Sequence, residues 1–274
     1  MGVVNVTPDS FSDGGLYADT ESAVAHGRQL LRDGADILDI GGESTRPGAT
    51  RPLVREELDR VVPVIRALSS EGAVVSVDTM RAEVAAAAVE AGATIVNDVS
   101  GGLADPDILR VVAATGATYV AMHWRAHADR MQELASYDGP GGVVAAVRAE
   151  LADRVAAIRA AGIADDRVVL DPGLGFAKGA THNWQLVAGL DRLADLGFPL
   201  LVGASRKSFL GRLLADADDR PRPVDEREAA GIALTVLLAQ RGVWCVRVHD
   251  VRANRDALRV LDRLTRETTT KESP

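Results

Sequence analysis

Short apolar runs rich in β-branched residues recur along the chain, and each is too brief to form a helix. The runs number eight and lie at 3–6, 37–40, 74–78, 95–98, 119–123, 168–171, 200–203 and 246–250. Longer segments with the helical spacing of apolar residues lie between and after them, at 21–32, 55–68, 143–161 and 254–264. This alternation of strand and helix predicts parallel strands joined by crossover helices.

Capping residues mark the start of two further helices. Asp105 before Pro106 predicts an N-cap followed by proline in the first helical turn. Asp225 with Glu228 three residues later resembles a capping box, with Asp in the position usually held by Ser or Thr.

The number and size of the units favour a barrel. Eight units in 274 residues give about 34 residues per unit, which fits an α/β fold of the (β/α)8 TIM-barrel type better than a doubly wound sheet. We find no repeat beyond the strand–helix period and no internal linker. We therefore predict a single-domain barrel over residues 1–267 and a disordered tail at 268–274.

Polar or ionisable residues end almost every apolar run. Any one of them could be a strand-terminating cap, but eight on one rim are better explained by an active site, which in this fold lies at the C-terminal ends of the strands. These residues are Asn5, Asp39, Asp78, Asn97, His123, Asp171, Ser205 and His249.

Composition narrows the functional classes. Hydrophobic residues make up 47% and charged residues 26% of the chain, which excludes collagen-like and wholly disordered proteins. The formal charge of −8 argues against nucleic acid as a partner, because phosphate would be repelled. Cys245 is the only cysteine, which predicts a reducing compartment and no disulfide. No apolar run approaches membrane-helix length, so we expect a cytoplasmic protein without membrane contact.

Two loops carry candidate chemistry near the start of the chain. The loop at 5–15 combines carboxylates, Phe11 and a Gly-Gly end, which suits a lid over a ligand but also an ordinary turn. In the loop at 41–48, Arg46 could meet an anion with its planar fork of donors, although a single loop arginine is usually only solvated.

Basic residues gather after the last two strands. Arg206 and Lys207 lie at a predicted helix N-terminus, where cations and free backbone amides together form an anion site. Arg247 and His249 are two residues apart and so lie on one side of their strand. A purely solubilising role is a poor fit for residues with apolar neighbours, so we predict a phosphate or pyrophosphate group on the substrate.

Acceptors on neighbouring strands suggest the rest of the substrate. Asp78, Asn97 and Asp171 suit a heterocycle rich in N–H donors, such as a guanine-like or pterin ring. The Gly-x-Gly after Asp171 lacks the third glycine of a dinucleotide site. His123 has no accompanying ligand cluster and is better explained as a hydrogen-bonded rim histidine than as a metal ligand.

Taken together, these segments resemble the bacterial dihydropteroate synthases, the folate-pathway enzymes that sulfonamides inhibit. The matching segments are NVTPDSFSDGG (5–15), GGESTRPGA (41–49), SVDT (76–79), VNDVSGG (96–102), MHW (122–124), LDPGLGFAK (170–178), GASRKSFLG (203–211) and RVHDV (247–251). They follow the family order over nearly the whole chain. The resemblance implies a (β/α)8 barrel and a homodimer. It also implies condensation of 6-hydroxymethyl-7,8-dihydropterin pyrophosphate with p-aminobenzoate, giving 7,8-dihydropteroate and pyrophosphate.

The resemblance also assigns site residues. Those implied to bind the pterin are Asp78, Asn97, Asp171, Lys207 and Arg247. Those implied to meet the pyrophosphate are Asn5, Arg46, Arg247 and His249, with Asn5 also binding Mg²⁺. Those implied to form the p-aminobenzoate pocket are Phe11, Thr45, Pro47, Phe176, Arg206, Lys207 and Ser208.

The implied chemistry is dissociative. Pyrophosphate neutralised by Mg²⁺ and cations is a good leaving group, so loss of the C–O bond can precede arylamine attack. We expect Asp13 to stabilise the resulting pterin cation, with Arg46 and Lys207 as the other catalytic residues. No covalent intermediate is needed, which fits the absence of a recognisable nucleophile triad.

Two alternatives remain open, and one departure from the family pattern stands out. A pterin-binding methyltransferase barrel has no reason to keep both the Arg46 loop and the anion site at 205–207. A catalytically silent pterin-binding paralogue should have lost parts of the first two loops, which are complete here. Family members carry a short segment before the first strand, whereas Met1 directly precedes it here, so we expect a truncated or misassigned start.

Overall fold

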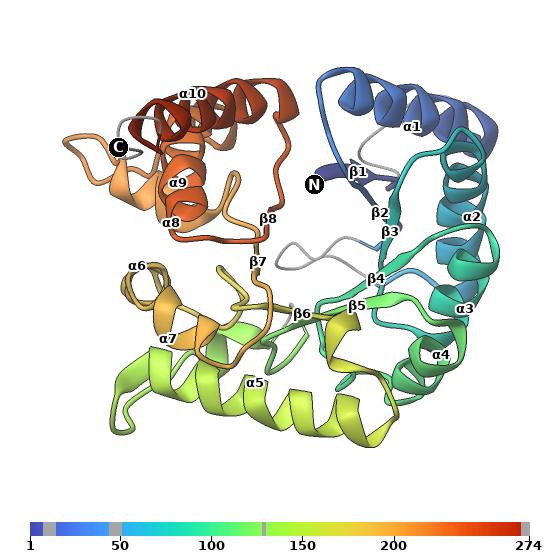
Figure 1. Cartoon of the computed structure of the whole chain (residues 1–274), viewed down its shortest axis with the longest axis horizontal. Helices are drawn as coiled ribbons and strands as arrows, with labels where there is room; N and C mark the ends of the chain where they lie inside the picture. Colours follow the sequence, from blue (N-terminus) through green and yellow to red (C-terminus); the bar gives the residue numbers. More distant parts are fainter. Residues whose placement is uncertain (8–14, 44–50, 128–129, 270–274) are drawn as a thin grey trace.

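The computed structural model describes residues 1–7, 15–43, 51–127 and 130–269 (Figure 1). Its strands pair in parallel throughout, with β1 to β6 forming one sheet in chain order and β7 and β8 forming another. The strands are β1 (Gly2–Asn5), β2 (Leu38–Gly41), β3 (Val75–Asp78), β4 (Ile95–Asp98), β5 (Thr118–Met122), β6 (Val168–Asp171), β7 (Leu201–Val202) and β8 (Cys245–Val246).

Single bridges close the two sheets into a barrel. Leu170 pairs with Leu200 between β6 and β7, and Gly2 pairs with Val248 where the chain leaves β8. The second junction is reinforced by Val248 N–H, which donates to the carbonyl of Met1 at 2.9 Å. The predicted (β/α)8 barrel is therefore confirmed.

Helices follow each strand and surround the barrel, with α1 and α10 on either side of the N-terminus (Figure 1). They are α1 (Gly15–Arg32), α2 (Val54–Ser70), α3 (Ala82–Glu90), α4 (Asp107–Thr115), α5 (Gly142–Ala160), α6 (Ala180–Ala188), α7 (Leu190–Ala194), α8 (Ser208–Leu213), α9 (Glu228–Gln240) and α10 (Val251–Thr269). Short 3₁₀ turns lie at η2 (Met131–Leu134), η3 (Asp165–Arg167) and η4 (Val224–Glu226). The first two residues of the expected tail, 268 and 269, belong to α10, and 270–274 lie outside the described residues.

One of the two capping predictions is confirmed to within one residue, and the other is wrong. Helix α4 begins at Asp107, one residue later than expected, and Asp105 Oδ1 accepts the N–H of Asp107 at 3.2 Å, as a capping side chain does. Its Oδ2 also accepts the N–H of Ala82 at the start of α3 at 2.8 Å. The capping box at Asp225 is wrong, because the short turn η4 intervenes and makes Glu228 the first residue of α9.

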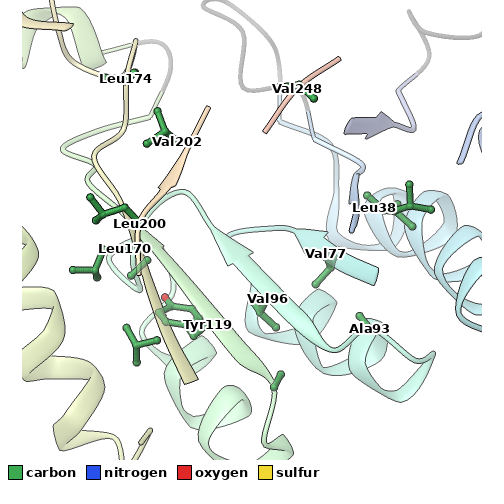
Figure 2. Close-up of a cluster of buried hydrophobic side chains, with 14 of the residues drawn as sticks. Leu38, Val77, Ala93, Val96, Tyr119, Leu170, Leu174, Leu200, Val202 and Val248 are labelled. Atoms are coloured by element: carbon green, nitrogen blue, oxygen red, sulfur yellow. The ribbon is translucent and has the colours of Figure 1, made fainter. Parts of the chain in front are cut away.

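Side chains alternate between the helices and the barrel interior along each strand. Outward residues join the main core beneath the helices, and Figure 2 shows Val77, Val96 and Tyr119 from three neighbouring strands in that cluster. A second, separate cluster fills the floor of the barrel with Met1, Ile95, Val120, Val169 and Leu201. The polar inward residues lie beyond this apolar floor, toward the C-terminal ends of the strands. The packed floor therefore supports the polar layer from below.

Candidate active site

A buried carboxylate organises the centre of the barrel. Asp39 on β2 accepts a hydrogen bond from Ser76 Oγ at 2.6 Å and one from Asn97 Nδ2 at 3.0 Å. Its Oδ2 also accepts from Nε of Arg247 at 2.6 Å. Asp39 is fully buried, so these donors replace the water that its charge would otherwise require.

Arg247 joins this centre to Asp78. Its Nη2 donates to Oδ2 of Asp78 at 2.8 Å, so one guanidinium spans carboxylates from β2 and β3. Burial raises the pKa of Asp78 to about 7, with Arg247 opposing the shift and Asp39 adding to it. Burial works against the charge of Arg247, but the two carboxylates prevail and hold its pKa above the usual range.

Asp171 and Lys207 form the opposite side of the site. Burial raises the pKa of Asp171 to about 6, although its Oδ1 accepts the N–H of Gly173 at 2.7 Å. Burial and Arg247 lower the pKa of Lys207 to about 8, and Asp171 opposes this shift. Nζ of Lys207 lies 4.2 Å from the ring centre of Phe176, a cation–π distance. Sites with several shifted pKa values are typical of ligand-binding or catalytic centres.

The ends of β7 and β8 meet through a hydroxyl and an imidazole. Oγ of Ser205 lies 3.0 Å from Nδ1 of His249 and accepts the backbone N–H of that histidine at 3.3 Å. Arg206 has a positive φ of 62° and pairs with Glu228 on α9 at 3.4 Å. Ser208 is exposed and begins α8. Asn5 is half-buried at the end of β1.

A second polar network lies beside the site. Nζ of the buried Lys178 lies 2.8 Å from Nδ1 of His123, and Nε2 of that ring lies 2.9 Å from Glu150 on α5. His123 is thus a hydrogen-bonded rim histidine, as predicted. Among the described residues no group of three or more His, Cys, Asp or Glu side chains could hold a metal ion.

Ion pairs hold the stem of the second loop. Glu43 and Arg51, which border the undescribed residues 44–50, pair at 2.8 Å. Arg81 lies 3.3 Å from the buried Glu57, whose pKa is raised by burial, and donates to the carbonyl of Pro52 at 2.6 Å. These contacts therefore fix the residues on both sides of this segment at the barrel rim.

The structure brings most of the predicted site residues that it describes into two groups. In the first, Arg247 donates to Asp78 and Asp39, and Asn97 also donates to Asp39. In the second, Lys207 lies near Asp171 and against the ring of Phe176, beside the β6–α6 loop. Five others lie outside the described residues: Phe11, Asp13, Thr45, Arg46 and Pro47.

Sequence reasoning placed Asp39 on the polar rim without giving it a specific role, and it assigned no role to Lys178. For Asp39 a signal existed, because a carboxylate interrupts an otherwise apolar strand at an inward position. The partner of Lys178 lies 55 residues away, which local spacing cannot reveal.

Fold and site together define the class: a (β/α)8 barrel with buried carboxylates and cations at the carboxyl ends of its strands, where active sites lie in this fold. A family model described as "Pterin binding enzyme" matches residues 1–249. Dihydropteroate synthase of Mycobacterium leprae is 53% identical over 262 residues, 95% of this chain and 91% of that protein. The Escherichia coli K12 enzyme is 41% identical over 263 residues, covering 96% and 90%.

Solved structures agree. Xanthomonas albilineans dihydropteroate synthase with 4-aminobenzoic acid has a TM-score of 0.86 and 44% identity, covering 100% of this chain and 93% of that one. The same enzyme with 7,8-dihydropteroate has a TM-score of 0.83 and 42% identity, covering 100% and 94%. The chain belongs to the dihydropteroate synthase family. The predicted family, enzyme class and activity are thereby confirmed.

Proposed function

We propose that this site condenses 6-hydroxymethyl-7,8-dihydropterin pyrophosphate with p-aminobenzoate, with the roles assigned below to individual residues. The observation that carries the proposal is the pairing of buried acceptors with cations. Arg247 donates to both Asp78 and Asp39, and Asn97 donates to Asp39. Burial raises the pKa of Asp171, and the charge of Lys207 opposes that rise. The methyltransferase alternative does not account for the cations.

The pterin would lie over the polar layer of the barrel. Asp78 and Asp171 would accept hydrogen bonds from ring N–H groups, with Asn97 able to donate and accept. Their burial strengthens these bonds, because water no longer competes for the carboxylates. Arg247 would stack on the ring, and Lys207 would approach it from the β7–α8 connection.

The pyrophosphate would lie toward the ends of β1 and β8. Asn5 is half-buried at the end of β1, where Gly41 is its strand partner. An amide oxygen suits Mg²⁺, which commonly takes one or two protein ligands together with substrate phosphates. Bound Mg²⁺ would neutralise charge on the leaving group. His249, oriented by Ser205, would meet the phosphates together with Arg247 and Arg46.

Cleavage of the C–O bond would come before attack by the amine. The cations stabilise the departing pyrophosphate, and Asp13 would stabilise the pterin cation that remains. The arylamine would attack from a pocket of Phe176, Lys207 and Ser208. Arg206, Phe11, Thr45 and Pro47 would complete that pocket.

Assembly and location are also part of the proposal. Membership of the family supports a homodimer, and the lone Cys245 supports a reducing, cytoplasmic location. Among the residues that the structure describes, no helix is both long and apolar enough to cross a membrane.

The test is pyrophosphate release by purified protein given the pterin pyrophosphate and Mg²⁺, with and without p-aminobenzoate. Dihydropteroate formed only with both substrates supports the proposal. Pterin binding without product would instead support the silent paralogue.

A further inference from the structure

Lys178 is a buried cation for which the proposed chemistry has no use. It lies at the end of the loop between β6 and α6, and only 4% of the residue is exposed. Its Nζ donates to the carbonyl of Gly173 at 2.9 Å and to that of Phe176 at 2.8 Å. The third partner is Nδ1 of His123, at 2.8 Å. An ammonium has three N–H donors, and these contacts use all of them.

The contacts determine where the protons lie. The pKa of Glu150 is lowered to about 2, so its ionised carboxylate can only accept, and Nε2 of His123 donates to Oε2 at 2.9 Å. In a neutral ring Nδ1 is then the acceptor for Lys178, whose pKa burial lowers to about 7. Burial and the neighbouring lysine lower the pKa of His123 to about 4, in keeping with a neutral ring. Arg125 holds the other oxygen of Glu150 at 2.5 Å. A continuous chain of bonds thus runs from Lys178 to helix α5.

The same lysine ties down the loop that carries Phe176. Besides accepting from Lys178, the carbonyl of Gly173 accepts the N–H of Phe176 at 3.1 Å, which closes a turn. The Phe176 ring lies 4.2 Å from Lys207 Nζ. A Cβ placed on Gly175 would lie 3.0 Å from Cδ of Lys207, so the loop and Lys207 are in close contact.

We propose that Lys178 is a positioning residue for the p-aminobenzoate subsite: by holding the carbonyls of Gly173 and Phe176, it keeps the Phe176 ring against Lys207. The bonds through His123 to Glu150 keep Lys178 in this place. This inference rests on the proposed function and adds a residue that acts on one substrate through another side chain. Lys178 makes no hydrogen bond to the pterin acceptors Asp78, Asn97 or Asp171, although its charge opposes the rise that burial causes in the pKa of Asp171. Its direct contacts are with His123 and the loop that carries Phe176, so its main effect is on the arylamine.

The test replaces Lys178 with Met, which keeps the length of the side chain and removes its donors. We expect the KM for p-aminobenzoate to rise about tenfold or more, because a small displacement of a positioning group is costly. At about pH 8, where Asp171 is ionised with or without the lysine, we expect kcat at saturation and the Kd for the pterin pyrophosphate to stay within about twofold. An unchanged KM for p-aminobenzoate would overturn the proposal, as would an equal loss of affinity for both substrates.

A double-mutant cycle shows whether the effect passes through Phe176. If it does, Lys178→Met adds less than about a twofold change in KM to a Phe176→Ala enzyme, since the two changes remove one interaction. Effects of the two substitutions that multiply in the double mutant contradict the proposal.

Glu150→Ala provides a second variant at a more exposed position, which tests the proposal if Lys178→Met fails to fold. Loss of the carboxylate should raise the KM for p-aminobenzoate by about threefold or more, whereas Asp153→Ala, at an exposed position on the same helix, should not. Equal KM values in the two variants would contradict the proposal. Turnover by the wild-type enzyme is measured first, because its absence counts against the proposed function and not against the role of Lys178.

Discussion

Nη2 of Arg247, the residue directly after β8, donates to Oδ2 of Asp78 at the end of β3 at 2.8 Å. The two strands are not neighbours in the sheet, because β1 and β2 lie between them. The same guanidinium binds Asp39 on β2, so one side chain from the end of the chain organises residues from its first third. The charges of Asp39 and Asp78, which come from two different strands, are therefore balanced by one guanidinium.

Arg247→Met should weaken both the fold and the pterin site. The substitution leaves the fully buried Asp39 without its cation, which costs about 3 kcal/mol or more in the free energy of unfolding. Urea unfolding measures this loss, and calorimetry with the pterin pyrophosphate measures the loss of affinity. Arg252→Met is the matched control, because Arg252 pairs with Asp33 on the surface and should change neither quantity appreciably. Equal behaviour of the two variants would show that the central ion pair is unimportant.

The sequence was sufficient for the barrel and for much of the site, because both depend on local patterns. Apolar outward positions such as Val77 recur with the period of a strand, and polar residues such as Asp171 follow at its end. Contacts between distant segments were not predictable in this way. Arg247 and Asp39 are 208 residues apart, and only barrel closure brings them together. The capping box at Asp225 was wrong because the spacing of two residues does not reveal the short turn η4, which makes Glu228 the first residue of α9.

Pterin affinity should increase with pH across the neutral range. The pKa values of Asp78 and Asp171 are raised from 3.8 to about 7 and about 6, so both carboxyls are largely protonated in mildly acidic solution. A protonated carboxyl is a poorer acceptor for ring N–H groups. Calorimetry between about pH 5 and pH 8 should show Kd for the pterin pyrophosphate falling as the pH rises, by up to about tenfold per pH unit for each carboxyl that must ionise. Asp171→Asn should remove the step near the lower value.

The raised pKa values of Asp78 and Asp171 also affect the free energy of unfolding, which should decrease with pH where pterin affinity increases. Because folding raises both pKa values, the native protein binds more protons than the unfolded chain between the unfolded value of 3.8 and the folded values. The contribution of the two groups to stability is therefore greatest below 3.8 and is lost as the pH rises through about 6 and about 7. Comparing the urea unfolding of wild-type protein and of Asp171→Asn across this pH range gives the contribution of Asp171. Identical pH profiles for the two proteins would contradict it.

Lys207→Ala should abolish most turnover while leaving the fold intact. The half-buried ammonium lies near both Asp171 and Phe176, so its removal takes away one cation from the site but few apolar contacts. We expect pyrophosphate release to slow by about 10²- to 10³-fold. The melting temperature should stay close to that of the wild type. Arg220→Ala, at an exposed arginine, is the control and should keep full activity. Near-normal activity in Lys207→Ala would remove this residue from the mechanism.

Gly173→Ala should disrupt the β6–α6 loop through a clash rather than through backbone strain alone. Gly173 has a φ of 68°, and a Cβ there would lie 2.3 Å from the carbonyl oxygen of His123, which is backbone and cannot move aside cheaply. Gly162 offers the matched comparison, with a φ of 86° and nothing within 4 Å of an added Cβ. Gly162→Ala should therefore cost only the strain of a left-handed residue, about 1–2 kcal/mol, with normal activity.

Gly173→Ala should cost more than Gly162→Ala in urea unfolding and should also raise the KM for p-aminobenzoate. The second effect arises because the carbonyl of Gly173 is one of the two held by Lys178, and its displacement releases Phe176 from Lys207. The free energy of unfolding and the KM for p-aminobenzoate are measured in both variants. Backbone strain is common to the two glycines, so any further loss in Gly173→Ala comes from displacement of the loop. Equal losses of stability, with KM unchanged in both, would mean that the loop relaxes around the added methyl group and that its position does not control the arylamine site.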